Sequence, residues 1–232
     1  MNEHTSKKFD AELEGIRTRV LQMGGMVELQ IVKAMEGLGG GDLLLIDQVI
    51  ENDNRVNLLE IELDEACNQV IAKRQPTAVD LRMVSTVQKT ITDLERIGDE
   101  AKKIAKTAKQ LHTATSPFMP QIRLSHIADA VVDMLRTALD AYARLDTIAA
   151  AQVVRQDKEV DAEFKGIMRQ LITYMIEDPR TISQAIELMF VAKSVERIGD
   201  HAKNIAEYVV YMVKGRDVRH TSLEEIEREA TR

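Results

Sequence analysis

Apolar residues recur at steps of three and four through six long stretches of the chain, which is the spacing of one face of an α-helix. Glycine and proline interrupt helices, and they separate several of these stretches, at residues 39–41, 75–77 and 178–179. The pattern therefore predicts six helices, over residues 9–38, 42–74, 78–112, 120–143, 146–176 and 180–214.

The chain also repeats itself. Asp93–Lys106 reads DLERIGDEAKKIAK and Ser194–Glu207 reads SVERIGDHAKNIAE, so that nine of the fourteen positions are identical. A shift of 104 residues aligns earlier positions as well, among them Asp42 with Asp146. Internal repetition of this kind indicates a tandem duplication of one helical unit.

The duplication defines the expected domains. Two three-helix units occupy residues 1–115 and 116–216, with Pro117 and Pro120 in the linker between them. Gly215 offers a stop for the sixth helix. The remaining residues, 217–232, form a charged tail that we expect to be mobile or only loosely docked.

The third helix of each unit carries a seam of apolar and small residues at alternating steps of three and four. Such a seam is typical of left-handed, nearly antiparallel helix packing. Gly98 and Gly199 lie on it at positions where glycine costs about 1 kcal/mol relative to alanine, so we expect another helix backbone to come close there. The fold class predicted is all-α, a tandem repeat of two three-helix antiparallel bundles with spectrin-repeat-like packing.

Composition narrows the function. The net charge of −7 disfavours nucleic acid and anionic lipid as partners. The single cysteine, Cys67, excludes an internal disulfide and is expected to be a packing residue. We see no secretory signal and no apolar run approaching the ~20 residues of a membrane span, which predicts a cytoplasmic protein without direct membrane insertion.

The repeated Glu-Arg-Ile-Gly-Asp motif places two carboxylates one helical turn apart, Glu95 with Asp99 and Glu196 with Asp200. Like charges at this spacing repel, and oxygen ligands so placed can share a hard or borderline cation. The competing interpretation is a set of surface ion pairs in which lysines neutralise Asp99 and Asp200 three or four residues along the helix. The lysines concerned are Lys102, Lys103 and Lys203.

The second helix of each unit supplies a further acidic position. Asp53 and Asp157 each interrupt a line of apolar residues, where a carboxylate must be paired, protonated or metal-bound. Asp157 has Asp161 one turn further on, whereas the first unit has Asn57 there. A buried hydrogen bond and a metal ligand are equally compatible with this pattern.

Sequence motifs for catalysis are absent: there is no P-loop, no GxSxG and no HExxH. The five histidines are scattered, and His201 is expected at the surface because consecutive helix residues do not face each other. These observations favour a regulator over an enzyme.

The twin motifs, together with RQPTAVDLR at 74–82 and GRDVRH at 215–220, resemble the PhoU family of phosphate-specific transport accessory proteins, over about residues 5–220. The resemblance implies a cytoplasmic homodimer that acts as a negative regulator of phosphate uptake and of the phosphate-starvation response. It also implies partners: the ATPase subunit of the Pst phosphate transporter and the PAS region of the sensor histidine kinase PhoR.

In this family such acidic pairs can bind divalent or trivalent metal ions, and Mg, Mn, Fe and Zn all remain open. Carried onto this sequence, the expected metal ligands are Glu95, Asp99, Glu196, Asp200, Asp157, Asp161 and Asp53. Asn57 departs from the acidic pattern and puts a symmetric pair of sites in question. A metal-dependent phosphate-ester hydrolase and a purely structural helical adaptor are the alternative functions.

Overall fold

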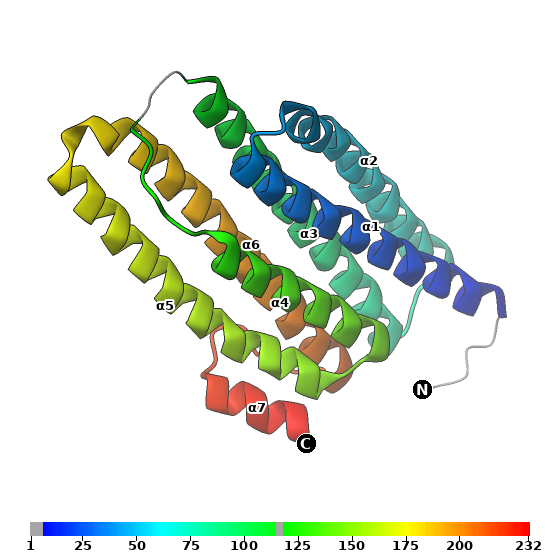
Figure 1. The fold of residues 1–232 in the computed structure, drawn as a ribbon. Helices are drawn as coiled ribbons and strands as arrows, with labels where there is room; N and C mark the ends of the chain where they lie inside the picture. Colours follow the sequence, from blue (N-terminus) through cyan, green and yellow to red (C-terminus); the bar gives the residue numbers. More distant parts are fainter. Residues whose placement is uncertain (1–6, 115–117) are drawn as a thin grey trace.

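The computed structural model describes residues 7–114 and 118–232, and the described part of the chain is built from helices alone (Figure 1). Its elements are α1 (Lys7–Gly40), α2 (Leu43–Arg74), α3 (Ala78–Thr113), α4 (Ser125–Arg144), α5 (Thr147–Glu177), the short 3-10 helix η1 (Pro179–Thr181), α6 (Ile182–Lys214) and α7 (Leu223–Thr231). The all-α prediction is confirmed. Pro117 and the boundary expected at residue 115 lie outside the described residues.

The two units begin their second helices in the same way. The carboxylate of Asp42 accepts hydrogen bonds from the backbone N–H groups of Leu44 and Leu45, and Asp146 does the same for Ile148 and Ala149. These are side-chain N-caps, which satisfy N–H groups that have no partner within the helix. Gly215 ends α6 in the left-handed conformation with φ of 72°, as expected of a helix stop.

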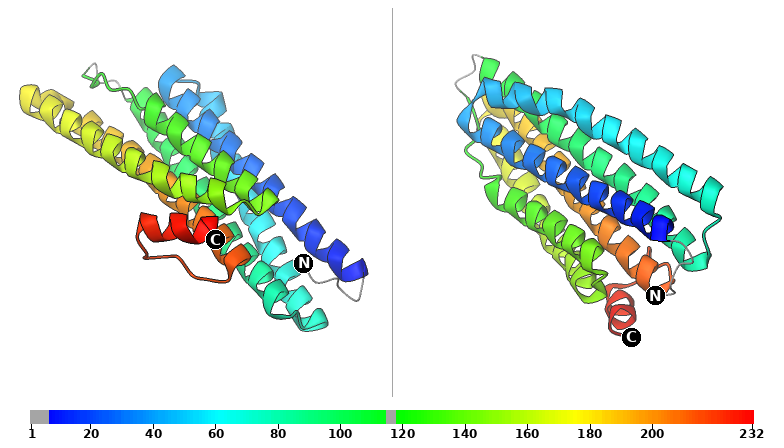
Figure 2. Two further views of the ribbon diagram at one scale, coloured as in Figure 1. Left: turned by 90° about the horizontal axis from the view of Figure 1, so that it is seen from below. Right: turned by 90° about the vertical axis from the view of Figure 1, so that its right-hand side faces the viewer.

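Three helices form each bundle, and the bundles lie side by side along their length (Figures 1 and 2). The first bundle contains α1, α2 and α3, and the second contains α4, α5 and α6. Two antiparallel pairs join them, α3 with α6 and α1 with α4, which leaves α2 and α5 at the outer edges of the described molecule. Four helices, two from each bundle, therefore form the interface between the bundles.

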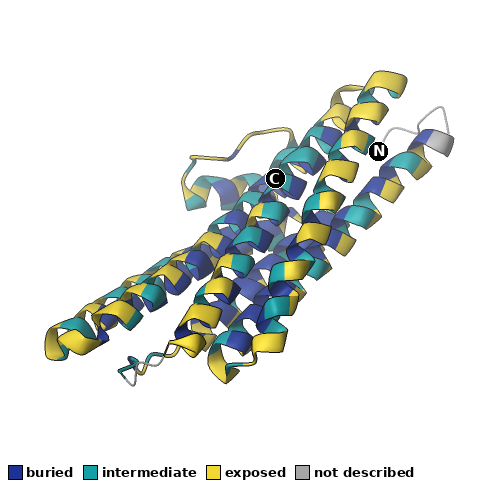
Figure 3. Ribbon diagram, turned by 90° about the horizontal axis from the view of Figure 1, so that it is seen from above, coloured by how far each residue is buried: buried dark blue, intermediate teal, exposed yellow. Residues whose placement is uncertain are grey.

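The core runs without interruption through both bundles and consists mainly of aliphatic side chains and methionine. Figure 3 shows buried positions facing the middle of the molecule and exposed ones lining its outside. Cys67 is fully buried, which confirms its role in packing. The seam residues of α3 and α6 are buried as predicted: Val84, Val87, Ile91, Leu94, Gly98, Ala101, Ala105 and Ala108, with Ala185, Leu188, Ala192, Val195, Gly199, Ala202, Ala206 and Val209.

The expectation of a helix backbone close to Gly98 and Gly199 was wrong. A Cβ atom on Gly98 would lie 3.2 Å from the Gln30 side-chain oxygen, and one on Gly199 would lie 3.3 Å from Val131 Cγ1. The space beside each glycine is filled by side chains of the other two helices of the same bundle. Glycine thus admits neighbouring side chains rather than a backbone.

The fourth helix begins at Ser125 and not at residue 120. Residues 118–124 instead form an extended connection, in which Leu124 is buried and the Gln121 carbonyl accepts a hydrogen bond from the Tyr174 hydroxyl. These contacts hold the connection against the second bundle. A helix over the same residues would have placed both groups elsewhere.

The C-terminal tail is not loosely placed. It forms α7, which packs on α5 through the buried Ile226 and Ala230 (Figure 2). The Thr147 hydroxyl donates a 2.7 Å hydrogen bond to the Ala230 carbonyl. The tail is rich in charged residues, but Ile226 and Ala230 lie four residues apart and therefore on the same face of α7, and this small apolar face packs against α5.

No helix of the described residues is long and apolar enough to cross a membrane.

Candidate functional site

A cluster of acidic side chains, the first acidic crevice, lies between α2 and α3. Glu95 on α3 is close enough to Asp99 on the same helix, and to Glu60 and Asp53 on α2, for the charges to interact. Burial raises the pKa of Glu95 above its ordinary value, and the negative charges of Asp99, Glu60 and Asp53 raise it further. Three of the expected ligands, Glu95, Asp99 and Asp53, are therefore brought together in the first bundle, and Glu60 joins them.

The buried carboxylate of this crevice is neutralised across the two helices. Asp53 is fully buried, and the Lys102 ammonium group donates a 2.7 Å hydrogen bond to its Oδ2 atom. That bond is the main reason why the pKa of Lys102 is raised. The competing interpretation paired Lys102 with Asp99 along α3, but Lys102 binds Asp53, because a fully buried charge attracts the cation more strongly than the half-buried Asp99 does. Lys103 also takes a different partner, Glu100.

Several polar atoms beside this ion pair have no hydrogen-bond partner. They are the Oδ1 atoms of Asp53 and Asn57 and both amide atoms of Gln30. Gln30 and Asp53 lie next to each other beside Gly98. Buried polar atoms are normally hydrogen-bonded, so this part of the first bundle has unused capacity for a water molecule or an ion.

A second crevice repeats the arrangement between α5 and α6. Lys203 donates a 2.7 Å hydrogen bond to Asp157 Oδ2, and not to Asp200 as the ion-pair interpretation expected. Burial raises the pKa of Asp200, with contributions from the charges of Glu196 and Asp157. Asp161 is half-buried and makes no ion pair with any described residue.

Two acidic residues of the crevices escaped the sequence analysis. Glu60 lies two turns after Asp53 on α2, and Glu207 lies one turn after Lys203 on α6. Burial raises the pKa of Glu207 to about 7. Helical spacing from residues already singled out was the available signal for both of them.

Oxygen donors of these kinds fit a hard cation, and the unpartnered Asp53 Oδ1 atom provides one free ligand position. In the described part of the chain, however, no three His, Cys, Asp or Glu side chains converge closely enough to surround a metal ion. A lysine ammonium group lies on the buried aspartate of each crevice. A metal ion at either place would therefore compete with that lysine.

A third polar cluster joins the two bundles. His201 on α6 lies 2.6 Å from Asp93 on α3 through Nδ1, and both side chains are buried. Asn204 and Tyr208 also hydrogen-bond to the Asp93 carboxylate. The expectation of a surface position for His201 was wrong, because the side of α6 that carries it packs against α3.

Replacing Asp93 by alanine is expected to lower the free energy of unfolding by about 1.5 kcal/mol, because the buried His201 and Tyr208 and the half-buried Asn204 lose their hydrogen-bond partner. Urea titration followed by circular dichroism measures the change. Ser194 is the matched control, since it occupies the corresponding position of the second repeat and is also buried. We expect Ser194→Ala to cost less than about 0.5 kcal/mol. Equal effects of the two substitutions would contradict a special role for the Asp93 cluster.

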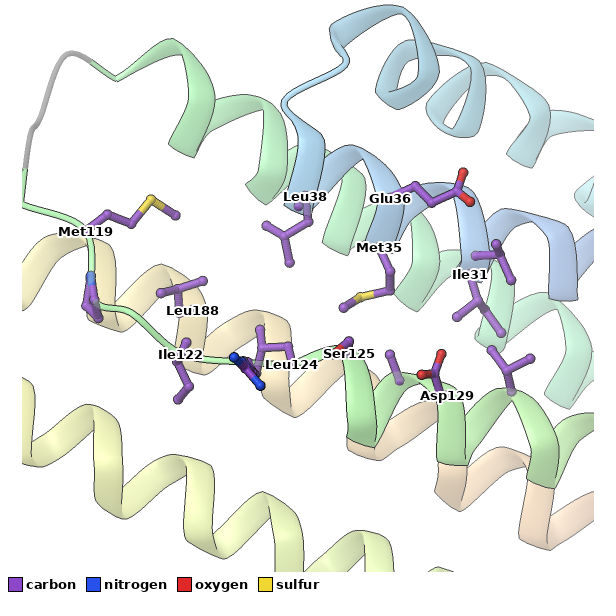
Figure 4. A pocket seen from close by; sticks show the side chains of 16 residues that line it. Ile31, Met35, Glu36, Leu38, Met119, Ile122, Leu124, Ser125, Asp129 and Leu188 are labelled. Atoms are coloured by element: carbon purple, nitrogen blue, oxygen red, sulfur yellow. The ribbon is translucent and has the colours of Figure 1, made fainter.

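A groove of about 470 Å³ lies between the end of α1 and the start of α4 (Figure 4). Met35 and Leu38 line it from α1, while Met119 and Ile122 line it from the extended connection. Asp129 and Glu36 lie at its edges. Its wall is mainly apolar, with Arg123 and Ser125 as further polar lining residues, and contains no residue of either acidic crevice.

The fold and these crevices define a class: helical proteins of two tandem three-helix bundles whose third helices each carry an acidic face. The model of the PhoU domain matches twice, at residues 20–108 and 124–209. The chain belongs to the PhoU family.

Relatives extend over almost the whole chain. The phosphate-specific transport system accessory protein PhoU of Serratia marcescens is 48% identical over 98% of this chain and 93% of its own length. The protein of the same name from Escherichia coli is 47% identical over 98% of this chain and 94% of its own. The crystal structure of PhoU from Pseudomonas aeruginosa matches 90% of this chain and 100% of its own with a TM-score of 0.85 at 46% identity.

Proposed function

We propose that this chain is a regulatory accessory protein of phosphate-specific transport, and that it acts as a negative regulator of phosphate uptake and of the phosphate-starvation response. The observation that carries the proposal is the similarity to accessory proteins of that transport system, at 47–48% identity over 98% of the chain. Similarity at this level extends through both bundles and the seam between them.

Protein–protein contact is the proposed mode of action. The chain would relay the state of the Pst transporter, through its ATPase subunit, to the PAS region of the sensor histidine kinase PhoR. We also propose a cytoplasmic location and a homodimer. A relay of this kind requires a partner with different affinities for two arrangements of the protein. The two bundles meet through two helix pairs, so a shift of one bundle against the other would be such an arrangement.

The polar chemistry favours binding over catalysis. Asp53 and Asp157, the most deeply buried carboxylates of the two crevices, are each held by a lysine at 2.7 Å. Carboxylates engaged in this way position helices and do not exchange protons with a substrate. The hydrolase alternative would require these pairs to open.

We propose a divalent or trivalent metal ion, of the type of Mg, Mn, Fe or Zn, as the ligand of the acidic crevices. Glu95, Asp99 and Asp53 would hold it in the first bundle, and Glu196, Asp200, Asp157 and Asp161 in the second. The unpartnered Asp53 Oδ1 atom supports the proposal. Burial is the main cause of the raised pKa values of Glu95 and Asp200, repulsion from neighbouring carboxylates adds to it, and a bound cation would offset both.

Alkaline phosphatase activity in phosphate-rich medium tests the function. We expect a strain lacking the gene to show high activity and the wild-type gene to restore repression. A variant with Glu95, Asp99, Glu196 and Asp200 all changed to alanine is expected to stay folded by circular dichroism and to lose most of the repression. Low activity in the deletion strain would contradict the regulatory role.

The same strains separate the alternatives. A folded quadruple variant that represses fully would show that the acidic faces are dispensable, as in a structural adaptor. Turnover of a phosphate ester by the purified protein, abolished by Glu95→Ala, would favour the hydrolase.

A further inference from the structure

A groove runs along the seam between α3 and α6 at the end near the start of α6. On α6, exposed side chains follow one line at helical spacing, first the apolar Ile182, Ile186 and Phe190, then the basic Lys193 and Arg197. Phe190 is 61% exposed, which is unusual for an aromatic side chain in a protein with so few of them. Phe190, Lys193 and Arg197 of this line form one wall of the groove.

Helix α3 forms the opposite wall. Lys103 and Thr107 line a space of about 300 Å³ together with Phe190, Lys193 and Arg197. Glu100 lies at its base, where it is buried and bonded to both Lys103 and Arg197. The groove thus has an apolar end and a cationic rim.

The charge of the groove is opposite to that of the molecule. The chain carries a net charge of −7, yet the three cations around this space outnumber the two carboxylates that they bind, because Lys103 and Arg197 share the buried Glu100 and Lys193 pairs with Glu196. A cationic rim beside an exposed aromatic side chain complements a segment that is acidic on one side and apolar on the other.

The other end of the seam shows what the chain itself places in the corresponding position. At the repeat offset of Asp93 to Ser194, Thr107 corresponds to Tyr208 and Gln110 to Tyr211. Lys89, the counterpart of Phe190, lies 5.5 Å and 5.4 Å from the centres of those two tyrosine rings. That end is therefore filled by side chains of the chain itself.

The segment that follows α6 adds to the closure of that end. Gly215 lies against the guanidinium group of Arg82, and Val218 is buried. Asp217 is near enough to Lys89 for the two charges to interact. A short stretch with an acidic and an aliphatic residue thus lies beside the filled end, whereas the Phe190 end has Thr107 and Gln110 in place of the two tyrosines.

We propose that the groove lined by Lys103, Thr107, Phe190, Lys193 and Arg197 is a docking site for an acidic amphipathic segment of a partner protein. The proposal rests on the regulatory function given above, since it supplies the surface through which such a protein recognises its partner.

A direct test uses a helical peptide of about 18 residues with leucine on one face and glutamate on the other. The control peptide has lysine in place of glutamate. Fluorescence anisotropy with the full chain is expected to show binding of the acidic peptide, weakened by added salt, and none of the basic peptide. Equal binding of both peptides, or of neither, would overturn the proposal.

Two variants locate the binding. Phe190→Glu and Lys193→Glu are each expected to weaken binding of the acidic peptide about tenfold. Both side chains are exposed, but Lys193 pairs with Glu196, so circular dichroism of Lys193→Glu accompanies the binding measurement to show that the variant is folded. Arg197 is left unchanged because it pairs with the buried Glu100. The matched controls are Ile176→Glu, at a position that is 76% exposed, and Lys73→Glu. An equal loss in the control variants would overturn the assignment.

The oligomeric state provides the remaining outcome. Analytical ultracentrifugation is expected to give the same mass for wild type and Phe190→Glu. Dissociation of the variant would show that a second copy of this chain occupies the groove and would overturn the partner assignment. The peptide results do not depend on the alkaline phosphatase test, so failure of one is distinguishable from failure of the other.

Discussion

Replacing Lys102 by methionine is expected to lower the free energy of unfolding by about 3 kcal/mol, the largest change of any single substitution considered. Lys102 supplies the cation for Asp53, which is fully buried on α2. Methionine keeps most of the volume and the packing of the lysine stem. The loss therefore measures the cost of leaving a buried carboxylate without its partner.

A double variant distinguishes the cost of an unpaired buried carboxylate from the net contribution of the Asp53–Lys102 ion pair to the free energy of unfolding. Asp53 interrupts an apolar line that includes Val49 and Val56, so Asp53→Leu in the Lys102→Met background extends the core. We expect the double variant to unfold within about 1 kcal/mol of wild type, because replacing both partners of a buried pair by apolar residues is often nearly neutral. Urea titration followed by circular dichroism gives both values.

Lys103→Met is the matched control. It removes a cation from the next position of α3, but its partner Glu100 keeps Arg197 at 3.1 Å. The control is expected to cost less than about 1 kcal/mol. If Lys102→Met proves no more destabilising than Lys103→Met, then Asp53 has another source of stabilisation.

The second large effect depends on pH. Burial raises the pKa of Glu207 from 4.5 to about 7, and the charges of Lys203 and Arg219 only partly offset it. As the pH rises through this window, Glu207 ionises in the unfolded chain before it does so in the folded one. The folded state then binds more protons, so stability decreases with rising pH.

Glu207→Gln removes that dependence, because an amide does not titrate. We expect the variant to be more stable than wild type by about 2 kcal/mol above pH 7, a figure reduced to allow for remaining solvent, and equally stable near pH 4. Urea titrations across this range give the comparison. Glu187→Gln, at a half-buried position of the same helix, should not change the pH profile. A parallel shift at all pH values would show an effect on packing instead.

Local sequence patterns were sufficient to predict the positions of most of the helices. Asp42 and Asp146 mark the starts of α2 and α5 because a side-chain cap acts within three residues, a distance that sequence records directly. The start of α4 could not be read in this way. Buried Leu124 and the Tyr174 hydrogen bond to Gln121 hold residues 118–124 extended, and both depend on the position of the second bundle.

The candidate site was predicted in part. Helical spacing identified Glu95 with Asp99 and Glu196 with Asp200 as paired carboxylates, and the interrupted apolar lines identified Asp53 and Asp157. It assigned the wrong partners to the lysines, since Lys102 and Lys203 reach across to the neighbouring helix. Spacing along one helix predicts contacts within that helix. It does not predict that a neighbouring helix places a more deeply buried carboxylate within reach of the same lysine.

The sequence by itself determined that this protein is a duplicated all-helical bundle with an acidic motif on the third helix of each repeat, because helical period, caps and repetition are properties of short stretches. Only the tertiary structure decided how the repeats meet. The packing of α3 against α6 buries His201 beside Asp93, fills one end of the seam with Tyr208 and leaves Phe190 exposed at the other. The two repeats differ in sequence at each of these positions, and which of the differing residues meet depends on contacts between residues more than 100 positions apart.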